Sequence, residues 1–464
     1  MINAWSLLYD EINGTLDEEY PIMSDKENIS DIYEKLLEFD DDDKKERLAF
    51  WPKQKGKSES FCMAPWITIY AQPDKNVRLC CAADGDIGSL NGNTLKDMWN
   101  SEEMKKSRLA MLKGEKVNAC HRCYEQEESG VDSFRISLNR QMFQHYDEMI
   151  PMTKEDGTVD KFNIKYFDIR FSNLCNFSCR SCSHMLSSGW YDDAKKLGAL
   201  SGDSKVLHID DETNAIFDEI EPMIPDIETF YFAGGEALFQ EEHYRILKRI
   251  IELEKFDSKI FYATNFSKLT YKDMNFIDIW KQIKKPIHMG ISFDAMGKRG
   301  EYMRKGQDWE KSVEHVKLFL KECPDHFLHI IPTLSIFNVF DLPDMHKFMV
   351  EECGMDVGAL YINMLTGPDI YRVHVLPKEF KERVKKKYID HIKWLQKGHE
   401  DGKFKYVDFI IRLFNHAIEF VMKEDYTSHL KDFYFNTSRL DKLRKEKFED
   451  VFSEYTDLKN YIKK

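Results

Sequence analysis

The sequence predicts an α/β fold in which an open, curved part-barrel of six βα units follows a small α+β module and precedes a helical C-terminal region. Short apolar segments alternate with longer amphipathic ones from residue 164 to about 365, which is typical of parallel strands joined by helices. A compact cysteine-rich block occupies residues 62–123, and residues 377–464 have a helical pattern rich in Lys, Glu and aromatic residues. Six units are too few for a closed eight-stranded barrel, so we expect an open sheet.

The chain divides into five predicted segments. They are an acidic N-terminal extension at 1–60, a cysteine-bearing module at 61–125, a connector at 126–160, the barrel at 161–365 and the helical region at 366–464. A run of acidic and basic residues inside the first segment is typical of a solvated surface, and we assign it no function.

The cysteine-bearing module is expected to begin with a hairpin. Residues 66–70 and 77–81 read as two strands joined by a Pro-Asp-Lys-Asn turn. A helix is expected to follow over 94–112, because Thr94 is a suitable N-cap and Gly114 a suitable stop.

The barrel strands are expected in six apolar segments: 164–171, 227–233, 258–264, 287–293, 326–334 and 357–363. Helical patterns lie between them, for example at 241–254 and 309–322. In parallel sheets of this kind, functional groups gather at the C-terminal ends of the strands.

Composition excludes several classes of function. The chain has 464 residues and a mass of 55.0 kDa, and 67 basic against 81 acidic residues give a net charge of −14. Neither nucleic acid nor an anionic membrane attracts such a chain, and no apolar run approaches the roughly 18 residues of a membrane span. Residues 1–20 lack the basic start of a signal peptide, so we expect a cytoplasmic protein whose ten cysteines serve metal or redox chemistry.

Three of these cysteines, Cys175, Cys179 and Cys182, follow the first barrel strand at CxxxCxxC spacing. Three thiolates can hold three irons of a cubane cluster and leave the fourth iron open to a small molecule. The alternative is a zinc site, but zinc usually closes with four ligands in CxxC or CxxH pairs, and no fourth ligand is nearby. The triplet therefore favours a cluster.

Polar and glycine residues stand at the ends of the next strands. Gly234, Gly235 and Glu236 follow the second strand, and two glycines permit close approach of the backbone to a ligand. Asn265 ends the third strand, while Ser292 and Asp294 end the fourth with short polar groups suited to ribose hydroxyls. Each group alone is more often a turn or a helix cap. Their succession beside the cysteine triplet favours a binding site.

This arrangement resembles the radical SAM superfamily over roughly residues 160–365. The resemblance implies a partial (β/α)6 barrel, a 4Fe–4S cluster on Cys175, Cys179 and Cys182, and S-adenosylmethionine bound to the open iron. Reductive cleavage of the bound S-adenosylmethionine then yields a 5′-deoxyadenosyl radical. The remaining contacts implied are Gly234, Gly235 and Glu236 at the methionine amino group, Asn265, Ser292 and Asp294 near the ribose, and Arg304 at the methionine carboxylate.

One position departs from the family pattern. An aromatic residue usually precedes the third cysteine and packs near the adenine, whereas this chain has Ser181. Phe177 is a candidate to compensate for it. The segment 334–338 resembles the part of the family that contacts adenine, although core packing explains most of its residues equally well.

A second set of cysteines lies in the N-terminal module, at positions Cys62, Cys80, Cys120 and Cys123. The gap across the hairpin is unlike the paired knuckles of a zinc ribbon, although four thiolates also suit zinc. Cys81 is an alternative to Cys80, because adjacent residues on a strand face opposite sides.

The cysteine pattern of the module resembles the twitch module, a shortened SPASM domain that binds one auxiliary 4Fe–4S cluster. The resemblance implies ligation by Cys62, Cys80, Cys120 and Cys123. Most such modules follow the radical SAM core, whereas this one precedes it.

We therefore expect a radical SAM enzyme that takes an electron from an external reductant such as flavodoxin or ferredoxin. Its auxiliary cluster is expected to assist electron transfer, and its substrate is a peptide or a small, sugar-like biosynthetic intermediate. The competing hypotheses are a non-enzymatic iron–sulfur electron carrier and a zinc-stabilised binding protein. An electron carrier needs neither Gly-Gly-Glu nor polar strand ends, so the sequence favours the enzyme.

Overall fold

A parallel sheet forms the centre of the molecule, as expected. The computed structural model describes residues 60–128, 133–200, 202–210, 214–405 and 407–462; the predicted acidic extension lies almost wholly outside them. The barrel strands are β4 (Tyr166–Ile169), β6 (Thr229–Phe232), β7 (Lys259–Thr264), β10 (Ile287–Ile291) and β12 (Phe327–Ile330). Neighbouring strands in the order β4-β6-β7-β10-β12 pair in parallel.

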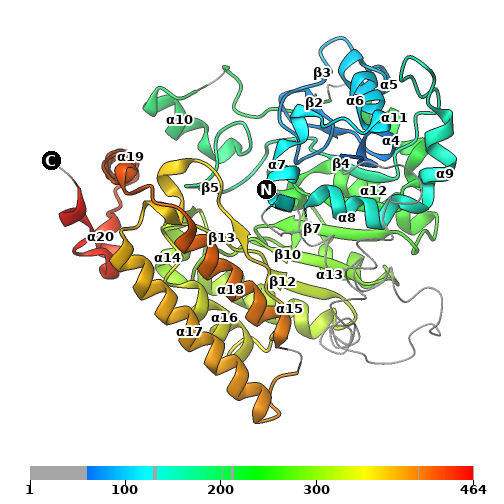
Figure 1. Cartoon of the computed structure of the whole chain (residues 1–464). Helices are drawn as coiled ribbons and strands as arrows, with labels where there is room; N and C mark the ends of the chain where they lie inside the picture. Colours follow the sequence, from blue (N-terminus) through cyan, green and yellow to red (C-terminus); the bar gives the residue numbers. More distant parts are fainter. Residues whose placement is uncertain (1–59, 129–132, 201, 211–213, 406, 463–464) are drawn as a thin grey trace.

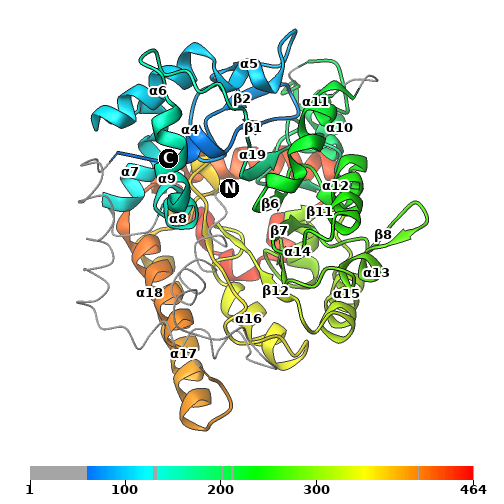
Figure 2. The same cartoon turned by 90° about the vertical axis from the view of Figure 1, so that its right-hand side faces the viewer.

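Helices pack along one side of these strands (Figure 2). They include α11 (Ala215–Ile220), α12 (Glu241–Glu252), α13 (Phe276–Trp280), α15 (Trp309–Glu322) and α16 (Leu342–Glu351). The ring centroid of Phe167 in β4 is 6.2 Å from that of Phe171, which is in turn 6.2 Å from that of Phe217 in α11, so odd-numbered residues of β4 face the helices. Even-numbered residues therefore face the opposite side of the sheet.

The helix predicted at 309–322 is confirmed with the same bounds. Its N-cap is Asp308, whose side chain accepts a hydrogen bond from the backbone N–H of Lys311. The helix predicted at 241–254 begins at the predicted residue and ends two residues early.

The last two predicted strands are partly wrong. The segment 326–334 divides into β12 and β13 (Thr333–Leu334), because Pro332 has no N–H to offer the ladder. In the segment 357–363, Leu360 forms an isolated bridge with Ile330, and regular pairing is confined to β14 (Asn363–Met364) beside β13.

The N-terminal module contains a hairpin that is shorter than predicted. The segment predicted as a first strand begins as a helix, α4 (Ala64–Ile67), and only β1 (Tyr70–Ala71) is extended. Pro65 stands in the first turn of α4, where its missing N–H costs no hydrogen bond. The partner strands are β2 (Asn76–Arg78) and β3 (Gly88–Ser89).

The single helix predicted at 94–112 is two helices, α5 (Leu95–Trp99) and α6 (Glu102–Lys113). Thr94 caps α5 as predicted, with a capping box to Asp97, and Gly114 ends α6 at φ 81°. The break arises because the side chain of Ser101 supplies a second N-cap. The connector that follows contains α7 (His121–Glu128), α8 (Phe134–Met142) and α9 (Tyr146–Met149).

The module and the barrel share one sheet, which the sequence analysis did not predict. Strand β1 pairs in parallel with β4, with Tyr70 opposite Asp168 and Ala71 opposite Ile169. The complete order is β12-β10-β7-β6-β4-β1-β2-β3. The hairpin of the module thus extends the sheet at its first barrel strand.

A buried ion pair lies at this junction. Asp168 and Arg170 are both buried, and Arg170 Nη2 is 2.6 Å from Asp168 Oδ1. The guanidinium of Arg170 lies over the rings of Tyr70 in the module and Tyr231 in the barrel, 5.6 and 4.7 Å from their centroids. Arg170 therefore links the two parts of the sheet through charge and ring contacts.

The C-terminal region is helical, as predicted. It consists of α17 (Lys378–Glu400), α18 (Asp408–Lys423), α19 (Leu430–Arg444) and α20 (Phe448–Val451). In Figure 1, α17 and α18 form a long antiparallel pair, and α19 and α20 lie on the side away from the module. Among the described residues, no helix has the length and apolar character needed to cross a membrane.

The remaining short elements surround the barrel: β5 (Ser178–Cys179), α10 (Tyr191–Leu197), β8 (Thr270–Tyr271), β9 (Met274–Asn275), α14 (Gly297–Met303) and β11 (Arg304–Lys305). Cys323 and Cys353, which the sequence analysis left to core packing, are both buried.

Candidate functional site

The loop that carries Cys175, Cys179 and Cys182 follows β4 at its C-terminal end. Within it, β5 pairs antiparallel with β11, which places Arg304 opposite Cys179. The indole N–H of Trp190 donates to the backbone oxygen of Cys179 at 2.7 Å. All three cysteines are partly accessible to solvent, so the loop lies at the surface end of the strand.

Two side chains direct hydrogen-bond donors at these sulfurs. Asn265 Nδ2 lies 3.9 Å from Cys175 Sγ, and Arg304 Nη1 lies 3.8 Å from Cys179 Sγ. Donors and positive charge beside a sulfur favour the thiolate that iron requires, and they tune the potential of a bound cluster. The donor set therefore fits a cluster.

Desolvation dominates the electrostatics of the three thiols. It raises the pKa of Cys175 to about 12, with a further contribution from the nearby Glu236 carboxylate. It also raises the pKa of Cys182 to about 12, with a contribution from Cys179. The metal-free thiols are therefore protonated near neutral pH, and loading iron onto them releases protons.

The glycine pair at the end of β6 lies against the cysteine loop. Gly234 and Gly235 adopt φ of 87° and 53°, a left-handed conformation that favours glycine. A Cβ on Gly235 would stand 2.6 Å from the backbone oxygen of Leu174. The backbone N–H of Glu236 donates to that same oxygen at 2.7 Å. Close packing of two backbones therefore explains the second glycine.

The carboxylate of Glu236 is held within the protein. It accepts hydrogen bonds from Thr264 Oγ1 at 2.6 Å, from the Asn265 N–H at 2.7 Å and from the Leu238 N–H at 3.2 Å. Burial nevertheless raises its pKa. Glu236 thus braces the ends of β6 and β7.

Asp294 and Arg304 are bound to each other. Arg304 Nε lies 2.8 Å from Asp294 Oδ2, and the N–H of Thr333 donates to Asp294 Oδ1 at 2.8 Å. Asp294 is fully buried, whereas Ser292 is half-buried. The sequence analysis missed this pair, because Asp294 and Arg304 carry no spacing signal for it.

A small cavity opens beside the cysteine loop. Its lining includes Ser181, Asp294, Ser335, Phe337 and Tyr371. Phe177, the candidate substitute for the missing aromatic residue, is fully buried and is not in this lining. Phe337 and Tyr371, with ring centroids 5.0 Å apart, are the aromatic residues present. Tyr371 lies beyond the predicted barrel, so the sequence patterns did not indicate it.

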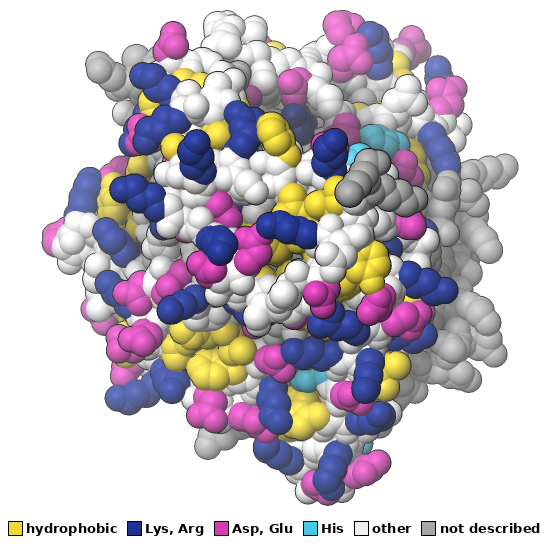
Figure 3. Space-filling view, turned by 90° about the vertical axis from the view of Figure 1, so that its left-hand side faces the viewer, with side chains coloured by type: hydrophobic (Ala, Val, Ile, Leu, Met, Phe, Trp, Pro, Cys, Tyr) yellow, Lys and Arg dark blue, Asp and Glu magenta, His cyan; other side chains and the backbone are white. Residues whose placement is uncertain are grey.

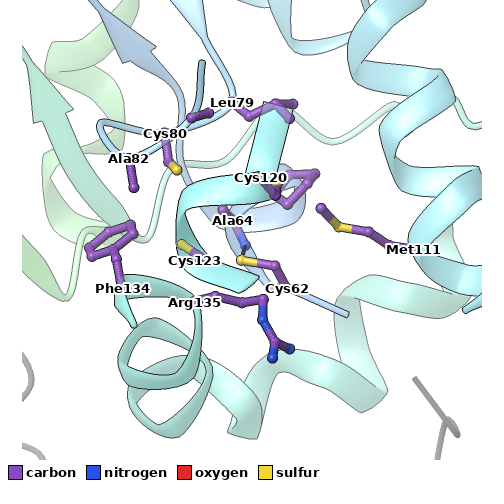
Figure 4. A pocket seen from close by; sticks show the side chains of 12 residues that line it. Cys62, Ala64, Leu79, Cys80, Ala82, Met111, Cys120, Cys123, Phe134 and Arg135 are labelled. Atoms are coloured by element: carbon purple, nitrogen blue, oxygen red, sulfur yellow. Dashed lines mark hydrogen bonds between the residues drawn. The ribbon is translucent and has the colours of Figure 1, made fainter. Parts of the chain in front are cut away.

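The four cysteines of the module surround a second cavity (Figure 4). Cys62 precedes α4 and Cys80 follows β2. Cys120 stands just before α7, and Cys123 lies in the first turn of α7. Cys81 is not in the lining; its thiol interacts instead with the carboxylate of Asp168. The geometry thus favours Cys80 over Cys81 as the fourth member.

Desolvation raises the pKa of all four thiols, and their proximity to one another adds to the shift for Cys62, Cys80 and Cys120. Within the described ranges, no three His, Cys, Asp or Glu side chains are close enough to hold a single metal ion. Cysteines around a cubane bind separate irons and stand farther apart than ligands of one zinc ion. Four thiols around one cavity are a donor set that a 4Fe–4S cluster accepts.

Comparison with known proteins identifies both regions. The model of the radical SAM superfamily matches residues 169–349, and the model of SPASM, an iron–sulfur cluster-binding domain, matches residues 62–124. No curated protein matches the sequence.

Similar solved structures include a TYW1 with a lysine–pyruvate adduct bound, at 14% identity and a TM-score of 0.28; the alignment covers 48% of this chain and 70% of that one. Streptococcus suis SuiB bound to S-adenosylmethionine aligns at 13% identity and a TM-score of 0.32, covering 64% of this chain and 63% of SuiB. A second SuiB structure aligns at 11% identity and a TM-score of 0.32, and it covers 63% of each chain. The chain thus spans less than two thirds of SuiB.

Proposed function

Because the chain is a radical SAM enzyme whose iron–sulfur cluster-binding domain precedes its radical SAM domain, we propose that it cleaves S-adenosylmethionine reductively and removes a hydrogen atom from a substrate. The proposed substrate is a peptide or a sugar-like biosynthetic intermediate. An external reductant such as flavodoxin or ferredoxin supplies the electron.

One observation carries the proposal: the Cys175–Cys179–Cys182 loop lies against Gly235 and Asn265, which follow β6 and β7, and against Arg304 of β11. In the proposal, these three cysteines hold the radical SAM cluster. A bound 4Fe–4S cluster with one open iron supplies the electron that splits the sulfonium into methionine and a 5′-deoxyadenosyl radical.

The chain's own residues orient the S-adenosylmethionine. The carbonyls of Gly234 and Gly235 accept hydrogen bonds from the amino group, and Ser292 lies on the ribose side. Arg304, held by Asp294, contributes positive charge near the carboxylate. The adenine enters the cavity beside Ser181, where Phe337 and Tyr371 offer apolar contact.

The module is proposed to act in electron transfer. Four cysteines around one cavity leave no iron open to a substrate. Because β1 pairs with β4, the module is attached to the strand that carries the radical SAM cysteine loop. The auxiliary cluster is thereby suited to accept or relay an electron from the reacting substrate.

Turnover without substrate tests the central claim. Protein reconstituted anaerobically with iron and sulfide is expected to convert S-adenosylmethionine to 5′-deoxyadenosine and methionine when dithionite is added, measured by chromatography and mass spectrometry. Boiled protein and reactions without reductant are the controls. Failure of an iron-replete preparation to form 5′-deoxyadenosine contradicts the proposal, and a colourless zinc protein favours the zinc-stabilised alternative.

A variant of the module separates the two clusters. Cys62→Ala/Cys120→Ala is expected to lower the iron content from roughly eight to roughly four atoms per chain while 5′-deoxyadenosine formation continues. The physical reason is that Cys62 and Cys120 line the module's cavity, whose lining includes no cysteine of the radical SAM loop. Cys323→Ala/Cys353→Ala is the matched control, since both residues are buried outside the two cysteine sets. An unchanged iron content in the Cys62→Ala/Cys120→Ala variant contradicts the assignment of these cysteines as ligands of the auxiliary cluster.

A further inference from the structure

A buried arginine lies inside the cysteine loop, between its second and third cysteines. Arg180 is almost fully buried, and its backbone N–H donates to the carbonyl of Met303 at 2.8 Å. Its guanidinium stacks on the ring of Tyr302, 3.5 Å from the centroid, and Nε donates to the Tyr302 carbonyl at 3.1 Å. A charge in such a place needs a partner of opposite sign.

The partners come from the C-terminal helical region, more than 250 residues later in the chain. Arg180 Nη2 forms ion pairs with Asp441 near the end of α19 and with Glu446, the latter at 2.8 Å. Asp441 also accepts the hydroxyl of Tyr302 at 2.7 Å and the N–H of Phe448 at 2.7 Å. Its carboxylate is thereby fixed from three sides.

A second arginine, Arg444, connects α19 to the cysteine loop. Arg444 Nη2 donates to the backbone oxygen of Ser178 at 2.8 Å, and its Nε pairs with Asp193 at 2.8 Å. Its guanidinium lies over Trp190, 4.7 Å from the ring centroid, and Trp190 itself bonds the carbonyl of Cys179. The backbone on either side of Cys179 is therefore held by the C-terminal region.

The charges of this group balance. Arg180 and Lys305 are positive, Asp441 and Glu446 are negative, and Lys305 Nζ lies 2.7 Å from Glu446 Oε1. Elsewhere on this side of the molecule, charged side chains of both signs are interspersed at the surface (Figure 3). The Arg180 group differs because Arg180 and Asp441 are buried, where solvent screens charge poorly.

We propose that Asp441, Glu446 and Arg444 are positioning residues for the radical SAM cluster, so that the C-terminal region completes the cluster site. These residues lie outside the segment that matches the superfamily model, which ends at residue 349. The carboxylates of Asp441 and Glu446 neutralise Arg180 beside the cysteines, and Arg444 holds the backbone of the loop at Ser178. This inference rests on the proposed ligation by Cys175, Cys179 and Cys182.

The sign of the electrostatic effect follows from the charge balance. Reduction adds one electron to the cluster, so an excess positive charge nearby stabilises the reduced form and raises the potential. Asp441→Asn leaves Arg180 in excess and is expected to shift the potential upward and slow S-adenosylmethionine cleavage. Arg180→Met leaves the carboxylates in excess and is expected to shift it downward.

The test is a potentiometric titration of the reconstituted full-length chain, followed by electron paramagnetic resonance. Asp441→Asn and Arg180→Met are expected to shift the potential in opposite directions, and the double variant to return toward the wild-type value. Arg180→Lys is expected to remain close to wild type. Asp432→Asn, an exposed position on α19, is the matched control. Limited proteolysis of the metal-free variants measures the rate of cleavage within residues 172–190. This rate shows how firmly the C-terminal region fixes the loop when no cluster is bound.

The outcomes are distinct. A wild type with no low-potential signal overturns the ligand assignment and this inference with it. A wild type with the signal, accompanied by Asp441→Asn and Arg180→Met variants that keep its potential and its proteolytic pattern, overturns this inference alone. Shifts of the same sign that add in the double variant also overturn it, because a general loss of structure behaves in that way.

Discussion

Replacing Cys175, Cys179 and Cys182 together by alanine is expected to abolish 5′-deoxyadenosine formation and to remove roughly half of about eight irons per chain. The three residues share one loop at the end of β4, whereas the module's four cysteines line a separate cavity. Iron and acid-labile sulfide counts on the variant, beside an absorption spectrum near ~400 nm, measure the result.

The iron that remains bound to this triple variant identifies the second cluster. The residual iron and a broad visible band are expected to resemble those of a single closed cluster, unaffected by S-adenosylmethionine. Complete loss of iron together with a folded circular dichroism spectrum contradicts two independent sites. Full retention of iron shows that these cysteines are not ligands.

Replacing Arg170 by methionine is expected to destabilise the protein by about 3–5 kcal/mol, the usual cost of leaving one buried partner of an ion pair unpaired. Asp168 and Arg170 are both buried, and Arg170 also contacts Tyr70 and Tyr231 across the junction of module and barrel. Urea unfolding followed by circular dichroism, with wild type and variant in the same metal-free state, measures the loss.

Two further variants show whether the loss of stability in Arg170→Met comes from the unpaired buried charge. Arg78→Met, on β2, removes an ion pair with Asp86 that is about one third exposed, and it is expected to cost about 0–1 kcal/mol. Asp168→Asn/Arg170→Met removes both buried charges and is expected to recover part of the lost stability. If Arg170→Met costs no more than Arg78→Met, the junction does not depend on this pair.

Features that depend on neighbouring residues were predictable. The helix at 309–322 has the predicted bounds because Asp308 caps it locally. Thr94 and Gly114 mark helix ends as predicted, Thr94 through its side chain and Gly114 through its left-handed backbone. The CxxxCxxC motif was readable for a similar reason, since short spacing on a loop limits what three thiols can bind. These signals lie within a few residues of the feature they specify.

The errors have a shared cause as well. Pro65 and Pro332 changed the local path of the backbone, which apolar alternation does not detect. The hydrogen bonds from Thr264 and Asn265 to Glu236 connect the ends of two strands. The sequence around either strand end gives no sign of this contact. The Glu236 carboxylate accepts these hydrogen bonds within the fold, and its predicted contact with a ligand's amino group stays a prediction.

Local residue patterns predicted a parallel α/β sheet, a radical SAM domain and a cysteine-bearing module ahead of it, and all three are confirmed. Only the tertiary structure shows that Cys80, and not Cys81, lines the module's cavity. It also shows that β1 pairs with β4 and that Asp441 forms an ion pair with Arg180. The physical reason is that pairing between distant segments depends on burial and charge compensation, which become defined when the chain is packed.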